Sequence, residues 1–124
     1  MRFAKRQSEE LKKFLYDSKI HDSKIKDLHY EWGTNTLLIK TFNPIFMVET
    51  DFTFVDVEIE FAIKGKELGS RETIISLTVE SDYEPIIKCQ REYSFNEESI
   101  YLLFQMFSGD EVHIVAKEVE IKVL

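Results

Sequence analysis

The tripeptide His21-Asp22-Ser23 contains the residue types of a hydrolase triad. Adjacent residues of a chain cannot place a nucleophile, a base and an orienting carboxylate in line, so the tripeptide alone predicts no catalysis. Short Asp and Ser side chains readily bond nearby backbone groups. We therefore expect a structural role, in which Asp22 and Ser23 bond local backbone amides at the entrance to a strand.

Three carboxylates, Asp56, Glu58 and Glu60, alternate along one segment. In a strand, neighbouring members of this row stand about 7 Å apart on one face. Holding a metal or pairing two carboxylates for catalysis would therefore require side chains from other strands. A solvated face is the first interpretation, and a binding surface for a basic protein is the second.

Metal, cofactor and nucleotide motifs are not found in the sequence. His21, His29 and His113 lack the spacing that puts two ligands on one helical face, the four glycines form no phosphate-binding loop, and Cys89 is the single cysteine. We therefore predict no metal, no cofactor and no catalytic residues, that is, a protein that is not an enzyme. A hydrolase assembled from scattered residues, such as His29 or His113 near the carboxylates, is the competing class.

The carboxylates belong to the segment Phe52–Gly65, which is the most regular strand pattern of the chain. Its alternate apolar residues form one predicted core-facing row. The row is Val55, Val57, Ile59, Phe61 and Ile63. Phe52 and Phe54 are out of phase with it, so we expect a bulge or bend between Phe54 and Val55.

The first third of the chain predicts a helix followed by a hairpin. Ser8–Asp17 has a capping serine, glutamates in its first turn and an apolar stripe. Lys24–Trp32 and Thr36–Phe42 are predicted strands joined by a turn at Gly33-Thr34-Asn35. The helix should cover one side of the sheet.

This arrangement, a short helix leading to His21-Asp22-Ser23 and then a hairpin, resembles small bacterial β-rich domains with a His-Asp-Ser signature. Some of those domains are uncharacterised, and others are similar to immunity proteins of polymorphic toxin systems. The resemblance covers about the first third of the chain. It implies a toxin-neutralising role.

The remaining segments complete the predicted sheet. Ile45–Val48 is four consecutive apolar residues, which favours a buried short strand over an exposed loop. Thr73–Glu80 should pair with Phe52–Gly65 as a second hairpin, and Ile86–Phe95 should bury Cys89. Val112–Leu124 alternates with a shift at Lys117-Glu118, as one bent strand or two.

Residues 97–108 fit either a strand or a helix. Asn96 as a cap, glutamates in the first turn, apolar residues at helical spacing and Gly109 after the end favour a late helix over Glu97–Ser108. The predicted fold is α+β: an N-terminal helix, an antiparallel β-sheet of about six strands curled as a half-barrel or sandwich, and this late helix. Residues 1–124 form one predicted domain.

Charge is distributed unevenly along the chain. Residues 1–40 carry nine Lys or Arg against six Asp or Glu, and residues 41–124 carry seven against seventeen. The acidic body disfavours nucleic acid and anionic membrane as partners. With one cysteine and no apolar segment after the basic first residues, we expect a cytoplasmic protein.

The predicted function is that of a small acidic protein-binding module, immunity-like, which neutralises a basic toxin or effector. Its candidate binding residues are the three carboxylates and, if exposed, three large apolar anchors. They are Asp56, Glu58, Glu60, Phe46, Met47 and Trp32. The alternative is a structural protein that self-associates through its basic first third and acidic body, so a monomer and a homodimer are both open.

Overall fold

The structure of this chain is a computed structural model. It describes residues 1–65, 72–81, 84, 96 and 98–124, without the side chains of Ile59 and Phe61. The predicted strand Ile86–Phe95, including Cys89, lies outside the described residues, as do the predicted inward side chains of Ile59 and Phe61.

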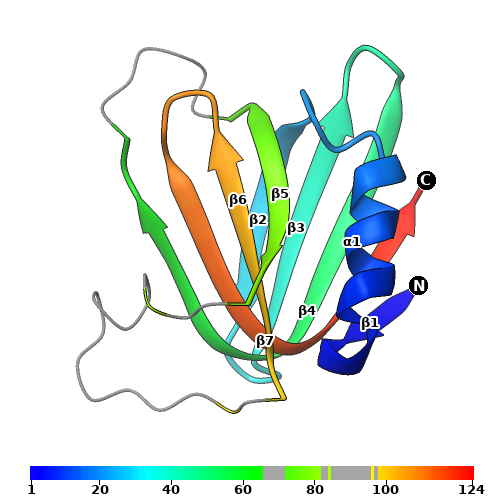
Figure 1. The fold of residues 1–124 in the computed structure, drawn as a ribbon. Helices are drawn as coiled ribbons and strands as arrows, with labels where there is room; N and C mark the ends of the chain where they lie inside the picture. Colours follow the sequence, from blue (N-terminus) through cyan, green and yellow to red (C-terminus); the bar gives the residue numbers. More distant parts are fainter. Residues whose placement is uncertain (66–71, 82–83, 85–95, 97) are drawn as a thin grey trace.

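The described residues form one N-terminal helix and one antiparallel sheet, which confirms the α+β prediction (Figure 1). The sheet order is β2-β3-β4-β7-β6-β5, and the short β1 pairs with β7. The elements are β1 (Arg2–Ala4), the 3-10 turn η1 (Lys5–Gln7), α1 (Ser8–Asp17), β2 (Lys24–Glu31), β3 (Thr36–Asn43), β4 (Val48–Ile63), β5 (Ile74–Glu80), β6 (Ile100–Met106) and β7 (Glu111–Val123). No helix in the described part is long and apolar enough to cross a bilayer.

The predicted half-barrel or sandwich is wrong, because the strands belong to a single open sheet. The edge strands β2 and β5 meet at one end only. There, the amide of Ile74 donates to the carbonyl of Ser23 at 2.8 Å, and the amide of Asp22 donates to the carbonyl of Ile74 at 2.9 Å. The second predicted hairpin is also wrong, since β7 and β6 lie between β4 and β5 in the sheet.

The predicted late helix over Glu97–Ser108 is wrong as well, because Ile100–Met106 is the strand β6. Glu97 itself lies outside the described residues. β6 pairs with both β5 and β7, and its consecutive residues Tyr101, Leu102 and Leu103 are all buried. A strand covered on both faces is apolar without alternation, so its pattern also fits a helix.

The segment Ile45–Val48 is not the predicted buried strand. Residues 44–47 form the turn between β3 and β4, and β4 begins at Val48. The exposed fractions of Ile45, Phe46 and Met47 are 67%, 55% and 73%. The side chain of Asn43 accepts hydrogen bonds from the amides of Ile45 and Phe46, which fixes the turn and leaves its apolar side chains outside.

β4 bends as predicted, but the bend is at Asp56 rather than between Phe54 and Val55. Phe52, Phe54 and Val57 of this segment are all buried. Two residues, instead of the usual one, lie between Phe54 and Val57, so the alternation of faces changes there. Asp56 lies between them with a left-handed φ of 51°, a conformation that Asp tolerates better than most residues. Figure 1 shows β4 and β7 changing direction together at the bottom of the view.

A second irregularity, not predicted, follows at once. The register of β4 against β7 shifts between Val57 and Ile59, and beyond it Glu60 pairs with Ile114. Directly opposed residues of neighbouring strands point to the same face, and Ile114 is a core residue. Glu60 therefore lies on the core side of the sheet, and the prediction that it occupies the opposite face is wrong. Ile63, predicted inward, is 39% exposed.

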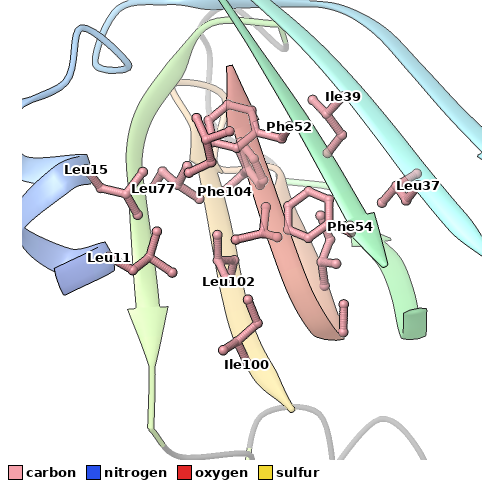
Figure 2. Close-up of a cluster of buried hydrophobic side chains, with 14 of the residues drawn as sticks. Leu11, Leu15, Leu37, Ile39, Phe52, Phe54, Leu77, Ile100, Leu102 and Phe104 are labelled. Carbon is pink, nitrogen blue, oxygen red and sulfur yellow. The ribbon is translucent and has the colours of Figure 1, made fainter. Parts of the chain in front are cut away.

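The core lies between α1 and one face of the sheet. Figure 2 shows Leu11 and Leu15 of α1 pointing toward Leu77 of β5, with side chains of β3, β4 and β6 filling the remaining space. Phe52 and Phe104 meet edge to face at 5.6 Å between ring centroids. Phe54 and Val57, on the two sides of the bend in β4, both belong to this core.

Candidate functional site

The six residues predicted to bind a partner divide between the two ends of β3. Trp32 lies in the β2–β3 turn, whereas Phe46 and Met47 lie in the β3–β4 turn. Since β3 has eight residues, these ends are roughly 25 Å apart. The structure therefore brings Trp32 and the carboxylates together and leaves Phe46 and Met47 elsewhere.

Trp32, Glu58 and Glu60 line a pocket of about 280 Å³ together with Tyr30 of β2, and this pocket is here called the Trp32 pocket. Tyr30 and Trp32 are two residues apart, and their rings meet edge to face with centroids 4.8 Å apart. The Tyr30 hydroxyl donates to the side-chain oxygen of Asn35. Trp32 is 86% exposed, so the pocket presents aromatic surface directly to solvent.

The two carboxylates of the pocket differ in how they are held. Glu58 is half-buried and accepts hydrogen bonds from the hydroxyl of Ser99 and, at 3.1 Å, from the amide of Asn96. Glu60 is exposed and has no ion-pair partner among the described residues. Glu58 is thus a fixed acceptor, and Glu60 is available for a cation from outside.

Asp56 lies next to this pocket without lining it. The amide of Val57 donates to the carbonyl of Asn35 at 3.1 Å, which ties the bend of β4 to the β2–β3 turn. Asp56 is exposed at that bend. It adds a third negative charge at the end of β3 where the pocket lies.

The apolar tip formed by Ile45, Phe46 and Met47 is a separate surface. The ammonium of Lys19 lies over the Phe46 ring, 4.5 Å from its centroid. One face of this exposed ring is therefore already in contact with a cation of the same chain.

His21-Asp22-Ser23 joins the two edges of the sheet. Asp22 has a left-handed φ of 68°, and its carboxylate lies 3.1 Å from Nδ1 of His21. The Ser23 hydroxyl donates to the carbonyl of Lys19 at 2.6 Å, a carbonyl rather than the predicted amide. The backbone of Asp22 and Ser23 bonds Ile74, so the motif lies at the entrance to β2 and positions β5 there.

His113 is buried on the face of the sheet opposite the core. Its Nδ1 lies 2.5 Å from the Tyr101 hydroxyl and its Nε2 lies 3.2 Å from Glu111. No local sequence pattern indicates this chain of polar groups, because the cross-strand pairing of β6 with β7 assembles it. In the described ranges, no three His, Cys, Asp or Glu side chains gather as a metal site would require.

Comparisons with protein-family models, with curated proteins and with solved structures find no match for this chain.

Proposed function

We propose that this chain is an acidic protein-binding module that takes an arginine or lysine side chain of a basic partner into the Trp32 pocket. The observation that carries the proposal is the pocket's lining of two aromatic rings and two carboxylates. A cation next to an aromatic face and a carboxylate gains from both contacts. The planar guanidinium of arginine can stack on a ring while donating to a carboxylate, so arginine is the better fit.

The surroundings of the pocket support the same partner. Exposed Asp56 adds negative charge at the same end of β3, and the chain has a formal net charge of −7. Complementary charge steers a basic protein toward this end of the sheet and speeds its association. Exposed Trp32 supplies the aromatic anchor that tight interfaces usually contain.

The proposed biological role, following the resemblance of the first third, is neutralisation of a basic toxin or effector protein. A basic toxin or effector would present arginine and lysine side chains on its surface, and these are the groups that the pocket would bind. The pocket provides one arginine-sized point of attachment, which fixes the register of the complex.

Trp32 is the only tryptophan, so its fluorescence reports binding at the pocket directly. We expect a short arginine-rich peptide to change the emission of Trp32 in a saturable way, and added salt to weaken the effect. The matched peptide with citrulline in place of arginine, which keeps the shape and removes the charge, should bind far more weakly.

Two variants that each remove one negative charge distinguish binding at the pocket from general attraction to the acidic protein. Glu60→Gln should weaken arginine-peptide binding about two- to fivefold, the range of one exposed ion pair. Glu10→Gln removes the same charge from exposed α1 and should leave binding unchanged. Equal weakening by both variants would show that the pocket is not the binding site, and a peptide that never perturbs Trp32 would refute the proposal.

A further inference from the structure

The two edge strands of the sheet differ in how they are protected from pairing with another chain. β2 carries charged or titratable side chains along its length and a register shift between Ile25 and Asp27. Both features prevent edge-to-edge pairing. β5 has a register shift only at its start, between Ile74 and Ser76, and Ile74–Val79 contains no charged residue. None of these protective features lies along Ser76–Val79, and among the described strands only β6 pairs with this part of β5.

A groove runs along this edge. Five consecutive residues, Ile75–Val79, line a cavity of about 520 Å³ together with Lys12, Leu15 and Tyr16 of α1 and with Ser18, Ile20 and His21 beyond it. Successive residues of a strand point to opposite faces of the sheet. All five can line one groove only if it follows the edge of the strand, so α1 and the edge of β5 are its two walls.

The backbone along the groove is free to pair. At Ile74, both the amide and the carbonyl are bonded to residues 22–23. Within the part of the chain that the structure describes, residues 75–80 make no backbone hydrogen bond apart from the ladder with β6. The outward N–H and C=O groups of β5 therefore face the groove.

From this geometry we infer a second binding site, independent of the Trp32 pocket: an extended segment of a partner protein adds to β5 as a new strand between β5 and α1. Main-chain hydrogen bonds to an open edge supply the affinity in this mode of recognition, and side-chain contacts supply the specificity. Tyr16, which is 90% exposed on the α1 wall, is the aromatic side chain available for such contacts.

The lining determines the chemistry of the segment. Among the described residues, the basic side chains that line the groove are Lys12 and His21, which lie 3.2 Å from Glu9 and 3.1 Å from Asp22. The floor consists of apolar and hydroxyl side chains. The groove therefore favours an extended segment that is mainly apolar and carries a carboxylate for Lys12.

A second copy of this chain does not fit the same place. The helix α1 forms one wall of the groove along the β5 edge, and the β5 edge of a second copy would have its own α1 beside it. Pairing the two edges would require both helices to occupy the space beside the paired strands. A single extended peptide has no such wall.

The probe is a displayed library of random short peptides, selected against the whole protein, with the consensus peptide then synthesised. When this peptide is added to the labelled protein, we expect the protein's amide NMR signals to shift mainly at Ile75–Val79 and Lys12–Tyr16. N-methylation of alternate peptide positions should weaken binding about three- to tenfold at one parity and hardly at the other, because only alternate amides face β5.

A pair of variants tests the charge preference. Lys12→Glu should weaken an acidic consensus peptide about two- to fivefold, the effect of an exposed ion pair. Lys13→Glu, the next residue of α1, does not line the groove and should have no effect. The inference is overturned if the library yields no binder, if the shifts lie away from β5, if N-methylation shows no parity, or if the pure protein dimerises through β5.

Discussion

Gly65 marks the place where the end of β4 packs against the turn between β6 and β7. Its amide donates to the carboxylate of Asp110 at 2.6 Å, and Gly109 in that turn has a φ of 83°. A methyl group on Gly65 would lie 2.6 Å from the amide nitrogen of Asp110 and closer still to backbone atoms of Ser108 and Gly109. Backbone atoms cannot give way as a flexible side chain does.

We therefore expect Gly65→Ala to lower the free energy of unfolding by about 1–3 kcal/mol, the usual cost of overpacking. Urea denaturation measures it. Gly33→Ala is the matched control, because nothing lies within 4 Å of a methyl group there, and it should change stability by less than about 0.5 kcal/mol. Equal stability of the two variants would contradict the close approach of Gly65 to the turn.

At the scale of the element, β6 is a strand buried on both faces. Leu102 belongs to the core shared with α1, and Leu103 faces the other side together with Tyr101 and His113. Leu102→Ala and Leu103→Ala should therefore both lower the free energy of unfolding by about 2–4 kcal/mol, as losses from a packed interior do.

The edge strand β5 supplies the comparison. Ile75 is 40% exposed, so Ile75→Ala should cost less than about 1 kcal/mol, whereas Leu77 in the same strand is buried. Thermal or urea unfolding of the three variants gives the result. If only one of Leu102 and Leu103 mattered, β6 would have an exposed face and the described sheet would be incorrect there.

At the scale of the whole molecule, the basic first third and the acidic remainder neutralise each other in part within one chain. Arg2 contacts Glu118 at 3.0 Å and Glu120 at 3.2 Å, and Lys24 lies 3.7 Å from Glu72. In the self-associating alternative, basic residues of the first third would pair with acidic residues of another copy. Here Arg2 and Lys24 already pair within their own chain.

We accordingly expect a monomer in sedimentation velocity, with no change in association between about 0.05 M and about 0.5 M salt, a range over which screening varies strongly. Arg2→Ala, which removes two of these contacts, should leave the monomer intact. A dimer that dissociates as salt rises would instead favour the structural, self-associating interpretation over the binding module.

The sequence by itself determined the elements whose patterns are local. The stripe of Ser8–Asp17, the alternation of β3 and the phase change after Phe54 each depend on residues close in the chain, and each corresponds to an observed helix, strand or bend. Alternation reports burial correctly when one face is covered and the other is wet. The sequence could name Trp32 as a binding residue only if its side chain proved exposed, because exposure depends on which other elements pack against it.

The tertiary structure decided everything that depends on which strands become neighbours. The segment of β6 fits a helical pattern because both of its faces are buried and so its apolar residues do not alternate with polar ones. This burial depends on the neighbouring strands, which no local pattern in the sequence predicts. The register shift after Val57 moved Glu60 to the core side, since one extra residue exchanges the two faces of a strand. Glu58 and Glu60 were predicted to face solvent in one row, but at this register shift and beyond it they line the Trp32 pocket. There they lie beside Tyr30, which belongs to a strand about thirty residues earlier in the chain.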